Sequence, residues 1–160
     1  MMNKEHIATA KGMNLGISRK FAVEIGRFIK RKKVSKVKTL LEGVIEIKVA
    51  VPFTKYHFDL GHKKGSIGPG RFPVSAAKEI LYLVKSAEMN AINKNFDMEN
   101  VYVSNVLVGM GNTTHRAGRL RGRLAKKTHV EIILEEKEVK KEDKKKVQKK
   151  WLKENLSQRK

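Results

Sequence analysis

The segment from residue 101 to residue 135 constrains the fold of this chain more than any other. Two β-rich runs, VYVSNVLV at 101–108 and THVEIILE at 128–135, flank a connection that contains several glycines. In the second run, Val130, Ile132 and Leu134 share one face. If the two runs pair as neighbours, the pattern predicts a β-hairpin whose arms of about 12 residues extend past the core as a ribbon of about 40 Å.

The connection between the two runs is strongly basic. Its sequence at 115–127 is HRAGRLRGRLAKK, which holds no acidic residue. A short run of like charge is often only a solvated loop. An isolated two-stranded ribbon is marginal in water, however, and arginine's planar fork suits phosphate and stacks on bases. We therefore expect RNA to surround these cations, which are Arg116, Arg119, Arg121, Arg123, Lys126 and Lys127.

The charge of the whole chain favours the same kind of partner. The 160 residues carry 36 Lys and Arg against 16 Asp and Glu, which gives a formal net charge of +20. Self-repulsion of this size favours a polyanionic partner, with nucleic acid as the leading candidate. A membrane partner is not expected, because we find neither an amphipathic helix with a broad apolar face nor a run of roughly 18 apolar residues.

Localisation and metal chemistry follow from what the sequence lacks. The amino-terminal residues have no apolar block of the signal-peptide kind, so a cytoplasmic location is expected. The chain has no cysteine, which excludes disulfides and thiolate zinc sites. Of the five histidines only His57 and His62 lie near each other, in a glycine-rich stretch, so neither a metal nor another cofactor is expected.

Helical periodicity predicts three helices. The first opens at the N-cap Ser18, the second begins near Ser35 and ends before Pro52, and the third covers about 75–93. The apolar positions of the three helices are Phe21, Ile25, Phe28 and Ile29, then Val37, Leu40, Leu41, Val44 and Ile45, then Ala77, Ile80, Leu81, Val84 and Ala91. The segment IATAKG at 7–12 is expected to add a third strand at the base of the ribbon.

Between the second and third predicted helices, the helical periodicity of apolar residues ends. Residues 53–73 contain glycines among Lys55, Lys63, Lys64 and Arg71, which predicts a long basic loop. Loops of this length in a compact domain are usually functional or disordered. Glycines allow close approach to phosphates, and the following helix N-terminus favours anions. The P-loop pattern GxxxxGK[ST] is absent.

From Lys137 the chain becomes a lysine-rich tail. Val147, Trp151 and a leucine at 152 or 156 form only a weak helical stripe. Such a helix is marginal without a partner, so disorder in free solution and helix formation on binding RNA or a neighbouring protein both remain open.

An enzyme is the first competing class of function. The sequence contains no recognisable nucleophile and base, no carboxylate pair for metal-assisted phosphoryl transfer, and no HExxH. Glu24, Glu42, Glu79 and Glu88 are interpreted as exposed helix charges. We therefore expect neither catalysis nor a small-molecule substrate. A second competing class is a general architectural nucleic-acid binder or RNA chaperone, which the composition alone would also support.

Four stretches together resemble a known family. They are ATAKGMNLGISRKFAVEIGRFIKRKKV, GHKKGSIGPGRFPVSAAKEIL, KSAEMNA and RLRGRLAKKTHVEIILEE, which lie in one order within residues 7–136. They resemble the universal large-subunit ribosomal protein numbered twenty-two, or seventeen in eukaryotes. The basic glycine loop and the lysine-rich tail are similar to its archaeal and eukaryotic branch.

The resemblance implies an α+β fold with three helices packed on a small three-stranded antiparallel sheet, a long protruding β-hairpin at about 101–135 and a basic C-terminal tail. It implies an RNA-binding domain at 1–136 and an extension at 137–160. The expected partners are large-subunit ribosomal RNA, neighbouring large-subunit proteins and the nascent peptide, because the family's hairpin helps line the exit tunnel. The hairpin tip would be Gly118, Arg119, Leu120, Arg121, Gly122 and Arg123.

The expected RNA contacts combine the family's motifs with the basic residues noted above. They are Arg19, Lys20, Arg27, Lys55, His62, Lys63, Lys64, Arg71, Lys78, His115, Arg116, Arg119, Arg121, Arg123, Lys126 and Lys127. This sequence departs from the family pattern in two places, at Arg19 and at the hairpin tip. Arg19 replaces a common proline, which helps a helix start but is not required. The tip, HRAGRLRGR, is several residues shorter than in archaeal and eukaryotic relatives and lacks their tryptophan, methionine and proline.

Overall fold

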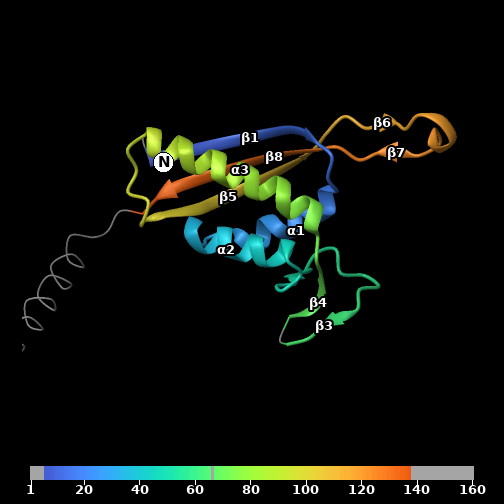
Figure 1. Cartoon of the computed structure of the whole chain (residues 1–160), viewed down its shortest axis with the longest axis horizontal. Helices are drawn as coiled ribbons and strands as arrows, with labels where there is room; N and C mark the ends of the chain where they lie inside the picture. The colour runs from blue at the N-terminus through green and yellow to red at the C-terminus, as the bar shows by residue number, and fades with distance from the viewer. Residues whose placement is uncertain (1–5, 66, 138–160) are drawn as a thin grey trace, which may run out of the picture.

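In the computed structural model, which describes residues 6–65 and 67–137, three helices lie against one antiparallel sheet from which a long hairpin extends (Figure 1). This confirms the predicted α+β class. The main elements are β1 (Ile7–Leu15), α1 (Arg19–Ile29), α2 (Val34–Ile45), α3 (Val74–Asn93), β5 (Val101–Met110) and β8 (Thr128–Glu136).

The main sheet has the strand order β1-β8-β5, and both pairings are antiparallel. Ile132 lies opposite Ala10 of β1 and opposite Val106 of β5, so β8 is bonded on both edges. The predicted third strand therefore exists, and it pairs with the second arm of the hairpin. Inward side chains of β8 alternate with outward ones, as the sequence pattern indicates.

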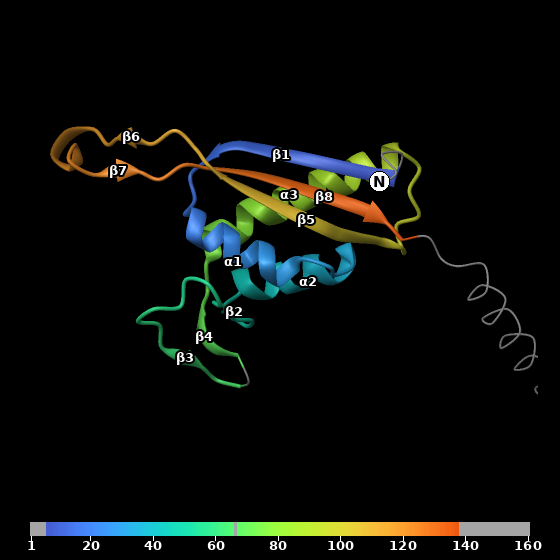
Figure 2. The same ribbon diagram turned by 180° about the vertical axis from the view of Figure 1, so that it is seen from behind.

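The helices bury the apolar stripes that the sequence predicts. α1 lies against β5, α3 lies against β1 and β8, and α2 packs on α3 (Figure 2). Ile25, Leu41 and Ile80, one from each helix, are fully buried. The helices also start within one residue of the predicted positions. Ser18 occupies the N-cap position of α1 but its side chain makes no capping hydrogen bond, and α2 begins at Val34, one residue before Ser35.

The prediction of a long loop at 53–73 is wrong in part. Three short strands, β2 (Val51–Pro52), β4 (Gly68–Arg71) and β3 (His62–Lys63), form a second sheet in the order β2-β4-β3. We call residues 51–73 the basic lobe; it projects from the helical side of the core (Figures 1 and 2). Gly68 has φ of +66°, which favours glycine at the turn into β4. Strands of two to four residues are too short to show a period-2 pattern.

The predicted hairpin is present and protrudes. Beyond the pair Met110 and Thr128 the two arms continue as β6 (Thr114–His115) and β7 (Leu124–Ala125) and close over a 3₁₀ turn, η2 (Gly118–Leu120). We call residues 111–127 the hairpin arm. Its axis continues that of the main sheet away from the core (Figures 1 and 2).

The hairpin arm is fixed to the core at its root by the end of β1. The backbone N–H of Asn14 donates to Nδ1 of His129 at 3.1 Å, and Oδ1 of Asn14 accepts the N–H of Asn112 at 3.1 Å. Nearby, the buried hydroxyl of Thr128 donates to the carbonyl of Ile17 at 2.8 Å. These bonds connect the segment before α1 to both arms of the hairpin.

No helix in the described ranges is long and apolar enough to span a membrane. Of the predicted lysine-rich tail at 137–160, all residues after Lys137 lie outside the described residues, so its disorder or helix formation stays a prediction.

Replacement of Gly111 by alanine should weaken the hairpin root. A Cβ at this position would stand 2.9 Å from the backbone carbonyl carbon of Lys127 and 2.9 Å from Oδ1 of Asn14, so the root must shift. We expect Gly111→Ala to lower the free energy of unfolding in urea by about 1–3 kcal/mol, the usual cost of overpacking. Gly122→Ala is the control, because its Cβ would meet nothing within 4 Å. Equal stability of the two variants would contradict a closely packed root.

Candidate nucleic-acid interface

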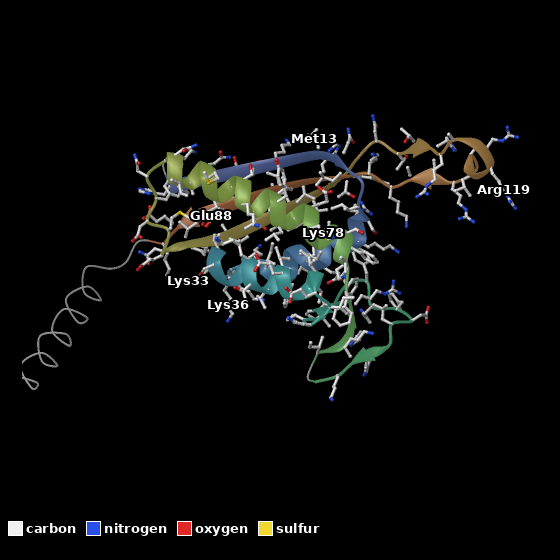
Figure 3. The ribbon with its side chains drawn as sticks, viewed as in Figure 1. Met13, Lys33, Lys36, Lys78, Glu88 and Arg119 are labelled. Carbon is white, nitrogen blue, oxygen red and sulfur yellow. The ribbon has the colours of Figure 1, made fainter. Side chains whose placement is uncertain are left out.

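The structure places the predicted RNA-binding residues in two regions. Those of the hairpin arm are His115, Arg116, Arg119, Arg121, Arg123, Lys126 and Lys127, and those of the basic lobe and the adjoining helices are Arg19, Lys20, Arg27, Lys55, His62, Lys63, Lys64, Arg71 and Lys78. All of these side chains are exposed except those of Lys63 and Lys127, which are half-buried. Arg119 lies at the far end of the hairpin, and Lys78 lies on the part of α3 that follows the lobe (Figure 3).

The tip of the hairpin arm is held together by backbone groups, so its cationic side chains remain available. The N–H of Arg116 donates to the carbonyl of Arg123 at 3.0 Å, and the N–H of Arg123 donates to the carbonyl of Leu120 at 2.8 Å. Nδ1 of His115 lies 3.1 Å from the carbonyl of Arg121. Among the described residues, none of the ion pairs involves a predicted RNA-binding side chain.

Four cations in and beside the basic lobe lie over aromatic rings. Arg71 stands 5.9 Å from the centroid of Phe21, and Lys63 stands 5.6 Å from that of Phe72. Both Lys20 and Lys55 approach the ring of Tyr56, at 5.6 and 5.7 Å. Such cation–π contacts restrain long side chains without neutralising their charge. The lobe therefore presents positive charge beside aromatic surface.

Glu24 corrects the interpretation of the helix glutamates as exposed. Its side chain is fully buried beneath the basic lobe. Its two carboxylate oxygens accept the backbone N–H groups of Thr54, Lys55 and Tyr56 at 3.1, 2.8 and 2.8 Å. Arg27 donates from Nη1 to the Thr54 hydroxyl at 2.9 Å. One carboxylate of α1 thus fixes the first turn of the lobe.

These contacts determine the ionisation of Glu24. Burial by itself raises the pKa of the carboxyl, but the hydrogen bonds from Thr54, Tyr56 and Lys55, with the nearby charge of Arg27, outweigh it and lower the pKa below the ordinary value of 4.5. The carboxylate is therefore charged at neutral pH and acts as a structural acceptor.

The other three helix glutamates differ from one another. Glu42 and Glu79 are exposed, as predicted. Glu88 is half-buried, and its carboxylate accepts from Lys38 at 2.7 and 3.0 Å, so the interpretation as an exposed charge is wrong there too. Within the described ranges, no three His, Asp or Glu residues gather into a group that could hold a metal ion.

Sequence reasoning missed the aromatic residues of the lobe as candidates for the interface. Tyr56 is half-buried under two lysines, and Phe58 is 82% exposed and stacks on His57 with a centroid distance of 5.0 Å. A signal was present, because Phe53, Tyr56 and Phe58 alternate with Lys55 and His57 in the sequence. Aromatic residues interleaved with cations are typical of surfaces that bind single-stranded nucleic acid.

Comparisons with known proteins agree with this arrangement. A model of the family described as ribosomal protein L22p/L17e matches residues 10–135. The chain is 35% identical over 135 residues to the large ribosomal subunit protein uL22 of Methanococcoides burtonii, covering 84% of this chain and 89% of the relative. It is 39% identical over 139 residues to that of Methanosphaera stadtmanae (82% and 90%) and 38% identical over 152 residues to that of Zea mays (88% and 89%). Archaeal and plant relatives confirm the predicted branch.

Replacement of Glu24 by glutamine should destabilise the fold in a pH-dependent way. The amide places N–H donors against backbone donors, so we expect Glu24→Gln to lower the free energy of unfolding at neutral pH by about 1–3 kcal/mol. The pKa of Glu24 is lowered in the folded state, so the contribution of the carboxylate is complete above the ordinary value of 4.5 and is lost as pH falls through the folded pKa.

Urea unfolding at neutral and acid pH measures this effect. The difference between the wild type and Glu24→Gln should shrink below a pH of about 4.5, and the exposed Glu42→Gln is the control, with little effect at either pH. A constant difference across this range would show that the carboxylate charge is not what holds the lobe.

Proposed function

Because this chain belongs to the ribosomal protein L22p/L17e family, we propose that it binds large-subunit ribosomal RNA through the hairpin arm and the basic lobe. The chain is a structural constituent of the large ribosomal subunit, which works in the cytoplasm, and it is not an enzyme. It therefore associates with the RNA and proteins of that subunit; the contacts of its own residues are the proposal.

The observation that carries the proposal is that the predicted RNA-binding cations form no ion pairs with acidic side chains of the described residues. In the described part of the chain, acidic side chains form ion pairs with Lys11, Lys38, Lys48 and His6, whereas no predicted RNA-binding cation forms one, although the charge of Arg27 lies near the carboxylate of Glu24. The hairpin arm has no acidic residue and exposes nearly all its side chains. A ribbon of this kind buries little apolar surface of its own, so surrounding phosphates would supply its stabilisation.

The two basic regions suit different features of folded RNA. The narrow hairpin arm fits between RNA helices, where arginine forks bond phosphates bidentately. The broader lobe offers lysines and aromatic rings together. Phosphate contacts of this kind position a protein without reading sequence, so recognition depends mainly on RNA shape. Residues 1–136 form the RNA-binding domain in this proposal, and 137–160 form an extension that contacts neighbouring RNA or protein.

The hairpin tip is proposed to help line the nascent-peptide exit tunnel. The extension of the hairpin arm from the core supports this role, because it carries the tip away from the globular body (Figures 1 and 2). Leu120 is 41% exposed between Arg119 and Arg121, so the tip combines apolar and cationic surface. Such a surface can contact both RNA and a passing peptide.

Sedimentation of cell extract is the first test of RNA-dependent assembly. The protein should travel with the large-subunit RNA in a sucrose gradient and remain there after a high-salt wash. Migration with all nucleic acid alike would favour a general architectural binder or RNA chaperone. Purified protein should also prefer large-subunit RNA over duplex DNA of equal charge, and indifference between them would have the same meaning.

Loss of two hairpin arginines should weaken RNA binding and its salt dependence. Each neutralised phosphate releases counterions, so Arg119→Ala with Arg121→Ala should make the slope of log affinity against log salt shallower by about 1.5. A titration series measured by fluorescence anisotropy checks this. Lys33→Ala with Lys36→Ala removes the same charge from the N-cap and first turn of α2, at the end of the core away from Arg119 (Figure 3). Equal losses in the two double variants would mean that the hairpin is not a preferred contact.

A further inference from the structure

A pocket opens between the first turn of α1 and the basic lobe. Its volume is about 190 Å³. The side chains around it are Lys20, Phe21, Phe53, Tyr56, Phe58 and Leu60, with Arg71 completing the rim. None of these residues is acidic. The pocket is thus small, largely aromatic and positively charged.

The aromatic lining has a buried part and an open part. Phe53 is buried and meets Phe21 edge to face at 5.6 Å, so these two rings belong to the packing of the lobe on α1. Phe58, in contrast, is 82% exposed, and its stack on His57, at an interplanar angle of 16°, leaves most of the ring in solvent. A large apolar ring in this position contributes little to the core. Exposure of such a ring beside a pocket is typical of a binding surface.

The polar lining is cationic and restrained. Lys20 reaches the ring of Tyr56 from α1, Lys55 reaches it from the lobe, and Arg71 lies over Phe21. Asp59 follows Phe58 in the chain but does not line the pocket. The buried carboxylate of Glu24, beneath the lobe, is occupied by backbone N–H groups. An anionic group at the rim would therefore meet positive charge from both α1 and the lobe.

We propose that this pocket receives one unpaired base of the ribosomal RNA, with the base against Phe58 and Tyr56 and its phosphates against Lys20 and Arg71. The inference rests on the proposed RNA binding and assigns the lobe a specific kind of RNA feature. Bases in an RNA double helix are not accessible to such a pocket, whereas a splayed base stacks on aromatic rings. An acidic peptide would use the cations but has no need of the exposed ring of Phe58.

The lobe is preorganised for this contact by Glu24. The carboxylate binds the N–H groups of Thr54, Lys55 and Tyr56, and only His57 separates these residues from Phe58, so the aromatic segment is fixed before RNA arrives. A rigid stacking platform avoids the entropy cost of ordering a loop on binding.

The test compares single-stranded and duplex RNA. Fluorescence anisotropy at one fixed salt concentration gives the affinity of the full chain for a short labelled single-stranded RNA and for a duplex RNA of equal charge. We expect Phe58→Ala to lower the affinity for the single strand about ten-fold, as loss of one stacked base predicts, with the duplex affinity unchanged. Phe58→Trp should retain the wild-type affinity. Tyr82→Ala is the matched control, because Tyr82 is 72% exposed on α3 and does not line the pocket.

The outcomes separate this inference from the proposed function. If the wild type binds RNA in a salt-dependent manner and Phe58→Ala binds the single strand equally well, the base pocket is wrong and RNA binding stands. Equal losses on both RNAs, or a poly-glutamate peptide that displaces RNA from the wild type but not from Phe58→Ala, would also overturn the pocket. Absence of RNA binding by the wild type would overturn the proposed function itself. Unfolding in urea should be the same for Phe58→Ala and the wild type, because the ring is exposed.

Discussion

The pairing of β8 on both of its edges organises the rest of this molecule. β1 and β5 are far apart in the sequence, and in the described sheet β8 joins them. The inward side chains of β8, which are Thr128, Val130, Ile132 and Leu134, are completely buried. Because side chains alternate along a strand, a shift of one residue in this register would turn that row to solvent. The same pairing fixes where the main sheet ends, at Met110 opposite Thr128, and so where the hairpin arm begins.

Charge is distributed unequally between the interior and the projecting parts. With 16 acidic residues against 36 basic ones, several carboxylates serve the fold itself. Glu24 binds backbone amides of the lobe, and Glu135 accepts from the hydroxyl of Tyr102 at 2.8 Å. That hydrogen bond and burial raise the pKa of Tyr102. The projecting cations are left unneutralised within the described chain, which is the condition that favours exchange of counterions for RNA phosphates.

The sequence predicts the elements whose signal is periodic and misses those whose signal is not. The three helices and the long strands follow from apolar spacing, which the core enforces. Glu24 is placed three residues after Phe21 and four before Phe28, within the apolar stripe, so its burial had a signal. The hydrogen-bond partners of Glu24 could not be predicted from the sequence, because they are backbone N–H groups about thirty residues away and a backbone group gives no side-chain pattern. The strands of the lobe are too short for a pattern, and the pocket depends on how α1 and the lobe pack, which no local spacing records.

One short stretch of chain connects the two basic regions mechanically. Asn14 and Ile17 bond the root of the hairpin arm, and Glu24 and Arg27 bond the basic lobe. Most of the intervening residues belong to α1, which packs against β5. A helix fixed on a sheet transmits little flexibility, so the hairpin arm and the lobe have a defined geometry relative to each other. Two surfaces held in this way bind a rigid RNA with less loss of conformational entropy than two independent basic segments would. In the proposed binding mode, the buried core therefore also contributes indirectly, because it fixes the spacing between the two regions.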